Sequence, residues 1–326
     1  MPEQPPEEER LPGGGERKAS AAGPKAAVDS GVWYPRWYWP SFAAPATLWI
    51  AVLFVLPFYV VVSVAFGTVD PIFRNPLPVY QPWWWSGQQF GEVLSRFVGA
   101  NPIFLPAAVR TLVFVAASSA ICLVLGYAVA YYVARYGGRR KGLFLVLLIS
   151  PFWISYLMRI YAWQSLLTED GYINDLMRFL HLIPTRVNWL EGKPITVVLG
   201  LVYGYIPYMI LPIYGQLDRI NQNLLESGRD LGASPIQTFW RVTLPLSKQA
   251  ILAGMVIVSL PMFGDYYTND LLGSTKTSMY GNLIDTTINN PGQGPQAGAL
   301  VIILIVLLMI PMGYYLRTTR KAVEEA

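Results

Sequence analysis

The feature that most constrains the fold is a series of apolar blocks, each long enough to cross a bilayer. An α-helix needs about 20 apolar residues for that. The chain has 326 residues, of which 53% are hydrophobic and only 13% are charged, whereas a soluble domain carries roughly 25% charged residues. The predicted fold class is therefore an all-α polytopic membrane protein. We expect six spanning helices, with ends good to about four residues, near 43–66, 108–134, 143–163, 195–215, 248–267 and 297–316.

The segments outside these blocks have compositions of their own. Residues 1–32 are rich in Pro, Gly, Glu and Ala, and so few large apolar side chains predict a disordered tail. Residues 33–42 hold several Trp and Tyr residues typical of a membrane interface, and residues 43–320 form the transmembrane domain. The aromatic run 83–85 suggests a further interfacial element between the first two spans.

Two further features bear on the kind of site that the chain can hold. Residues 172–180 predict a short amphipathic helix, followed by the lone His181. Without a second His, an HExxH motif or a Cys pair, His181 is expected to lie on the surface rather than bind a metal. The single Cys122 excludes an intramolecular disulfide.

Positively charged residues predict the orientation of the spans. With the N-terminus in the cytoplasm, 16 of the 24 Lys and Arg residues fall on the inner side: Arg10, Arg17, Lys18, Lys25, Arg36, Arg135, Arg139, Arg140, Lys141, Arg219, Arg229, Arg241, Lys248, Arg317, Arg320 and Lys321. Both termini are then cytoplasmic, and so is the long loop 216–247.

That loop contains an ordered polar stretch, 226–245, between two apolar runs. Ser234 followed by Pro235 predicts a helix start, so that one short helix ends near Gly232 and another begins. Gly228 and Gly232 are four residues apart, which places them on one helix face that another surface could approach closely. The alternative is an ordinary loop between membrane helices.

The order of residues in this stretch resembles the "EAA" loop of ATP-binding-cassette importer permeases. The family pattern is Glu-Ala-Ala, three residues, Gly, nine residues, Ile, any residue and Leu-Pro; here the alanines are Ser227 and Gly228 and the Ile is Val242. In that family the loop forms a coupling helix that docks on the ATPase subunit. The resemblance implies that the docking residues are Glu226, Ser227, Gly228, Asp230, Leu231, Gly232, Ala233 and Ser234.

The chain has no nucleotide-binding loop of its own. No G-x-x-x-x-G-K-[ST] occurs, because Gly192-Lys193 is followed by Pro194. No arrangement of catalytic side chains is present either, so the chain is expected to be a transport subunit and not an enzyme. The ATP and Mg would be bound by a separate ATPase.

Two other segments narrow the resemblance to spermidine/putrescine permeases. Residues 150–163 continuing into 167–174 look like that subfamily's third-helix signature, and 271–273 with 279–284 look like its segment before the last helix. Permeases for ferric iron or thiamine share parts of this pattern. The resemblance, which extends over roughly residues 45–316, implies a type I importer in the cell membrane. Its parts would be two related permease subunits, an ATPase dimer and an external solute-binding protein.

Two ionisable residues are predicted to lie deep in the membrane. Arg159 and Asp265 are each about 17 residues into a span, roughly 26 Å from its cytoplasmic end, where charges are costly unless paired or facing water. One interpretation is that they neutralise each other. The other is that they belong to a pathway for a cationic solute lined by Asp265, Tyr266, Tyr267, Trp153, Tyr156 and Arg159.

Two other classes of membrane protein were compared with this interpretation. A secondary transporter needs its own coupling-ion site, usually with several intramembrane acids, and Asp265 is the one acid well inside a predicted span. An interaction or structural membrane protein would have the helices without the ordered coupling loop. The importer permease therefore accounts for more of the sequence.

Overall fold

The computed structural model describes residues 37–99 and 102–324, so the predicted disordered tail 1–32 and residues 33–36 lie outside the described residues. The described chain is built almost wholly from helices. Its only strands, β1 (Thr68–Val69) and β2 (Pro76–Leu77), pair antiparallel. Of the described residues, those up to Val55 form one unit, which contains α1 (Tyr38–Ile50) and a π-helical turn, Ala51–Val55. All later elements belong to the second unit.

The second unit carries the remaining helices. The longer ones are α2 (Leu56–Ala65), α3 (Gln88–Val98), α4 (Phe104–Tyr136), α5 (Lys141–Ile149), α6 (Tyr156–Leu167), α7 (Tyr172–Phe179), α8 (Pro194–Arg219), α9 (Gln222–Asp230), α11 (Leu244–Phe263), α13 (Tyr280–Asn289) and α14 (Gly294–Glu324). The short ones are α10 (Pro235–Thr238), α12 (Tyr267–Leu272), the 3₁₀ turns Pro82–Trp84, Gly138–Arg140, Ser150–Trp153 and Thr275–Thr277, and the π turn Phe239–Thr243.

Five helical segments of the described chain are long and apolar enough to cross a membrane: Tyr38–Ala65, Phe104–Tyr136, Pro194–Arg219, Pro235–Phe263 and Gly294–Arg320. They confirm five of the six predicted spans as continuous. The third, expected as one helix over 143–163, is instead a pair of helical pieces bent by 84°. The break has a local cause, because Pro151 lies in the 3₁₀ turn Ser150–Trp153 and the next residue, Ile154, is extended with ψ 139°.

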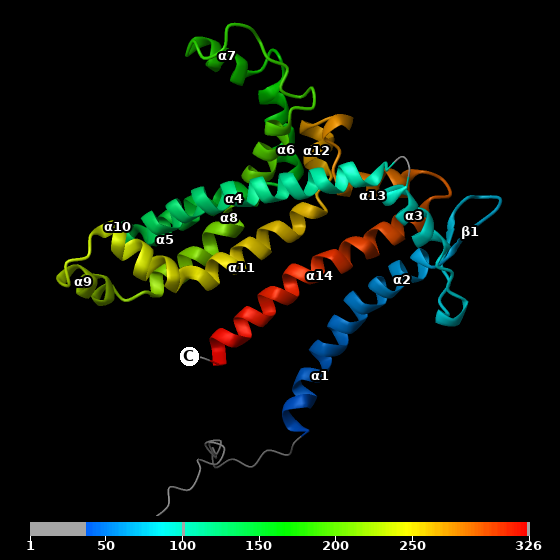
Figure 1. Ribbon diagram of the computed structural model, residues 1–326, viewed down its shortest axis with the longest axis horizontal. Coiled ribbons are helices and arrows are strands. Elements are labelled where there is room, and N and C mark those ends of the chain that lie inside the picture. Colours follow the sequence, from blue (N-terminus) through cyan, green and yellow to red (C-terminus); the bar gives the residue numbers. More distant parts are fainter. Residues whose placement is uncertain (1–36, 100–101, 325–326) are drawn as a thin grey trace, which may run out of the picture. The chain divides into compact units, whose positions relative to one another are not determined.

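The core of the second unit lies where α4, α8 and α11 run side by side (Figure 1). Small residues permit this close approach. A side chain at Gly126 would meet Met209 at 3.1 Å, and one at Gly254 would meet the Met209 sulfur at 2.7 Å. Cys122 is fully buried in the same cluster and is a free thiol.

A smaller cluster joins α3, α4, α13 and α14 around Tyr280. The Tyr280 hydroxyl donates to the Leu300 carbonyl at 2.9 Å, and its backbone N–H donates to the Thr111 hydroxyl at 2.7 Å. Because both hydrogen bonds cross between helices, this residue fixes α13 to α4 and α14.

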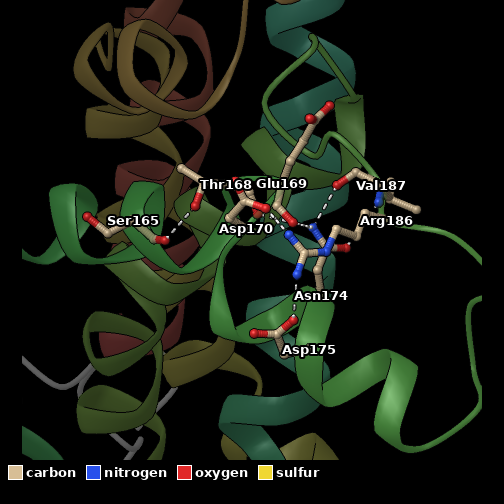
Figure 2. Close-up of polar contacts among 8 residues, drawn as sticks. All are labelled: Ser165, Thr168, Glu169, Asp170, Asn174, Asp175, Arg186 and Val187. Carbon is tan, nitrogen blue, oxygen red and sulfur yellow. Dashed lines mark hydrogen bonds and ion pairs between the residues drawn. The ribbon is translucent and has the colours of Figure 1, made fainter.

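The amphipathic helix predicted at 172–180 is confirmed as α7, and Asn174 fastens it (Figure 2). The fully buried Asn174 amide donates to the carbonyls of Thr168, Glu169 and Val187 at 2.9–3.1 Å. Its oxygen accepts from the Val187 N–H and the Trp189 ring N–H, both at 3.1 Å. His181, which follows α7, is exposed and has φ +56°, and no metal-binding group is found among the described residues.

We expect Asn174→Ala to loosen this region strongly, because each buried polar group left unpaired costs about 1–3 kcal/mol. The measurement is limited proteolysis of the segment 168–190 together with thermal unfolding of the purified protein. Asp175→Ala is the matched control. It removes an exposed ion pair with Arg186 (3.4 Å), which contributes roughly 0–1 kcal/mol. Equal protease sensitivity in the two variants would contradict the role given to Asn174.

Candidate functional site

The loop between α8 and α11 has the helix–turn–helix form that the sequence predicts. The helix α9 ends at Asp230, and α10 begins at Pro235 after a complete capping box. The Ser234 hydroxyl accepts from the Gln237 N–H at 3.3 Å, and the Gln237 side chain accepts from the Ser234 N–H at 3.0 Å. The predicted helix start at Ser234-Pro235 is thus confirmed.

The prediction that Gly228 and Gly232 share a helix face is wrong. Gly232 lies beyond the end of α9 with φ +84°, in the left-handed region that favours glycine. The Ala233 N–H donates to the Gly228 carbonyl at 3.1 Å, as in a Schellman helix end. A side chain at Gly232 would meet no atom of the described residues within 4 Å.

The surface of this loop carries large apolar side chains that the described chain leaves uncovered. Leu231 is 89% exposed, and Ile236, Trp240 and Leu224 are also exposed. Among the predicted docking residues, Glu226, Ser227, Asp230 and Ser234 are exposed as well, and Gly228 and Ala233 are half-buried. Apolar groups rimmed by polar ones are typical of a surface that binds another protein.

The loop is anchored to the membrane helices through aromatic contacts. The Phe239 ring lies edge-on to Tyr127 at 5.6 Å and to Tyr131 at 5.9 Å, both on α4. Leu225 of α9 packs against the same core cluster. The loop is therefore packed directly against α4.

Asp265 lies in a cage of hydrogen-bond donors at the far end of α11. Its Oδ2 atom accepts from the hydroxyls of Tyr156 (2.8 Å), Tyr205 (3.1 Å) and Thr268 (2.8 Å), and its Oδ1 accepts from the Thr268 N–H (3.0 Å). The side chain is 6% exposed. The cage thereby joins α6, α8 and the α11–α12 connection.

The positions of Asp265 and Arg159 differ from those predicted. The helix α11 ends at Phe263 with Gly264 as its cap, so Asp265 lies just beyond the fifth span rather than inside it. Arg159 lies beyond the break in the third span, and counting rise along a straight helix from the cytoplasmic end does not apply to it.

Arg159 does not pair with Asp265 in this structure. Its guanidinium carbon lies over the Phe152 ring at 4.2 Å and near the Tyr156 and Tyr203 rings at 5.6 and 5.7 Å. Its Nε and Nη1 atoms find no acceptor among the described residues. The interpretation that the two charges neutralise each other directly is therefore wrong for this conformation, and Tyr156 is the side chain that contacts both.

The remaining predicted pathway residues are more accessible. Trp153 is 79% exposed, and Tyr267 is 40% exposed. The rings of Tyr266 and Tyr267 lie 4.0 Å apart. The structure thus brings the half-buried Tyr156 together with the buried Arg159 and Asp265. Trp153 and Tyr267 are exposed, and Tyr266 is half-buried.

Several residues of this region were not singled out from the sequence. Tyr205 and Thr268 complete the cage, and Asp270 lies nearby on α12, outside the membrane-spanning helices. Burial, and then the neighbouring Asp285, raise the pKa of Asp270, although Asn282 donates to it at 2.6 Å. Asp270 could have been selected from the sequence as a candidate site residue, because it is an acid four residues after Tyr266 in the pair Tyr266-Tyr267.

The sequence and the fold were compared with known proteins. Residues 143–320 match the family described as the binding-protein-dependent transport system inner membrane component. The spermidine/putrescine transport system permease protein PotB of Escherichia coli is 35% identical over 220 residues, which are 68% of this chain and 80% of the relative. The protein of that name from Haemophilus influenzae is 34% identical over 220 residues, 68% of this chain and 77% of the relative.

A solved structure shares the fold. A chain of the bacterial alginate ABC transporter, crystallised in complex with an alginate pentasaccharide-bound periplasmic protein, superposes with a TM-score of 0.67 at 17% identity. The match covers 88% of this chain and 95% of that chain.

Proposed function

Because the chain belongs to the family of binding-protein-dependent transport system inner membrane components, we propose that it forms half of the membrane path of an ATP-driven importer for polyamines. One observation carries the choice of solute. The spermidine/putrescine permease of Escherichia coli is 35% identical over 80% of its own length. Spermidine and putrescine are organic cations, which agrees with aromatic rings and carboxyl groups beside the proposed path.

The partners follow from the transport cycle of such an importer. A second, homologous permease subunit completes the path, a dimer of ATPase subunits binds ATP and Mg, and an extracytoplasmic binding protein delivers the solute. The docking element for the ATPase is the exposed segment from Glu226 to Ser234, supported by its uncovered Leu231 and its family spacing. The orientation that places this loop in the cytoplasm places both termini there and the chain in the cell membrane.

The proposed solute path on this chain runs past the start of α6 and the end of α11. The residues proposed for it divide into two groups. The first group is the exposed Trp153 and Tyr267 and the half-buried Tyr266. A ring face attracts an ammonium group by roughly 0.5–2 kcal/mol. The second group is the buried Asp265 and Arg159 with the half-buried Tyr156, and these residues hold the elements that present those rings.

Transport is expected to require ATP and the binding protein, and to continue when ion gradients are collapsed. The measurement is uptake of labelled spermidine into vesicles that contain the complete complex, with and without internal ATP, with the same cations at equal concentration on both sides and an uncoupler present. A secondary transporter would stop importing under those conditions because its coupling ion has no gradient, and that result would sink the proposal.

The solute is tested separately from the energy source. Putrescine should compete with spermidine for uptake, whereas ferric iron and thiamine should not. If one of the latter is imported and polyamines are not, the permease assignment stands and the polyamine assignment fails.

A further inference from the structure

A polar cavity of about 200 Å³ separates the inner end of α4 from the coupling helix α9. Tyr131, Arg135 and Tyr136 of α4 line one side. The other side is lined by Gln222, Leu225 and Glu226 of α9. The cavity therefore lies between the docking element and the membrane helix that anchors the loop.

Arg135 lines this cavity with a positive charge and with hydrogen-bond donors that have no acceptor among the described residues. Its Nη1 donates to the carbonyl of Ile220, the residue that caps α8, at 3.3 Å. Its Nε and Nη2 are buried and have no acceptor among the described residues. A guanidinium keeps its charge at all physiological pH values and presents its N–H groups as a flat fork. Burying such donors unpaired is costly, so the cavity favours a ligand that accepts two hydrogen bonds.

A carboxylate is the group that fits this fork, because its two oxygens accept from two parallel N–H groups. The Glu226 carboxylate lies on the opposite wall, and it is exposed. It forms no ion pair with Arg135 here; the ion pairs found within the described chain are Lys141–Asp218, Arg186–Asp170 and Arg186–Asp175. Arg135 and Glu226 thus line the same cavity without forming an ion pair, and α9 would have to move toward α4 for the pair to form.

We infer that the cavity is a carboxylate-binding site, and that Glu226 of the same chain enters it when the ATPase docks on α9. The inference rests on the proposed coupling function. In the closed state the Nε and Nη2 groups of Arg135 donate to the Glu226 carboxylate on α9. Its Nη1 group remains hydrogen-bonded to the Ile220 carbonyl at the end of α8. Arg135 then acts as a positioning residue that ties a movement of α9 to α8, the helix that carries Tyr205 of the outer cage.

A double-mutant cycle tests the pairing in the complete complex reconstituted in liposomes, with spermidine uptake and ATP hydrolysis as readouts. Arg135→Gln should lower uptake about tenfold in the otherwise unchanged chain, the size expected for one charged, hydrogen-bonded pair. In the Glu226→Gln background the same change should matter less than about twofold. If the cavity holds only water, the two losses multiply, and the inference is overturned.

Controls separate this role from a structural one. Arg140→Gln removes an exposed positive charge from the neighbouring turn and should leave uptake unchanged. Arg135→Lys keeps the charge but not the fork, and should restore part of the loss. The variants are compared only at equal amounts of assembled complex, measured by co-purification of the ATPase.

A second measurement does not depend on transport. Cysteines at Tyr136 and Gln222, on opposite walls of the cavity, should cross-link faster when the ATPase subunit is added, and Cys122 is buried and does not compete. An unchanged rate refutes closure of the cavity. If the cross-linking responds as expected but no solute is imported with ATP, the carboxylate site stands and the importer assignment fails.

Discussion

The Gly232→Asp chain is expected to insert into the membrane at the normal level, to import no polyamine, and to lose control over ATP hydrolysis. The reason is positional. Gly232 lies in the proposed docking element beside the exposed Leu231, and none of the described residues has an atom within 4 Å of where its side chain would be. Under the docking proposal, an added carboxylate would meet the ATPase surface and not the described residues of this chain. Normal transport by the purified complex with this change would refute the docking assignment.

Two further substitutions at Gly232 distinguish the effects of side-chain size, charge and backbone strain on transport. Asn has the size of Asp without its charge and tolerates a left-handed conformation better than most residues. Ala adds one methyl group, but at φ +84° it carries a strain of roughly 1 kcal/mol. We expect Asn to block transport nearly as well as Asp, and Ala to reduce it partly. A fully active Asn variant with a poor Ala variant would mean that the position serves only as a helix cap.

Asp265→Asn should lower polyamine uptake by about tenfold or more, a change that corresponds to about 1.4 kcal/mol, while leaving assembly intact. Asn keeps the shape of Asp265, and its oxygen can still accept from the Thr268 N–H. The loss is that of the negative charge beside the proposed cation path. Uptake and the amount of assembled complex are measured separately. Unchanged uptake would remove Asp265 from the site.

Matched variants distinguish the charge of Asp265 from its cage. Tyr205→Phe removes one of the three hydroxyl donors and keeps the charge; hydrogen bonds between membrane helices average about 0.6 kcal/mol, so the loss should be roughly threefold. Adding Arg159→Gln to Asp265→Asn should rescue nothing, because the Arg159 guanidinium lies on the Phe152 ring. Poor assembly restored by that second change would instead mean that the two charges neutralise each other.

Local sequence signals predicted the elements that depend on neighbouring residues. Ser234-Pro235 determines a helix start through its own hydrogen bonds, and α7 follows from the spacing of its apolar side chains. Five spans follow from length and hydrophobicity alone. Each of these features is decided within a window of about 20 residues.

Features that depend on distant residues could not be predicted in this way. The partners of Asp265 come from positions 156, 205 and 268, and no local pattern links Tyr205 to Asp265. The helix end near Gly232 was predicted from the sequence, but the four-residue spacing wrongly placed Gly232 on one helix face with Gly228, because spacing does not show that Gly232 is left-handed. The sequence indicated that Arg159 and Asp265 are costly to bury. The side chains that contact them could not be predicted, because those contacts depend on how α6 packs on α8 and α12.

The break in the third span has a consequence for how the chain enters the membrane. The nine residues of α5 and the four of the following 3₁₀ turn rise only about 20 Å, whereas the hydrocarbon core is about 30 Å thick. This piece is too short to be stable alone in lipid, and α6 brings Arg159 with it. The insertion machinery must therefore release the third span together with α4, which contacts α5, and α8, which contacts α6. Biogenesis of this protein then proceeds by helix groups and not by single helices.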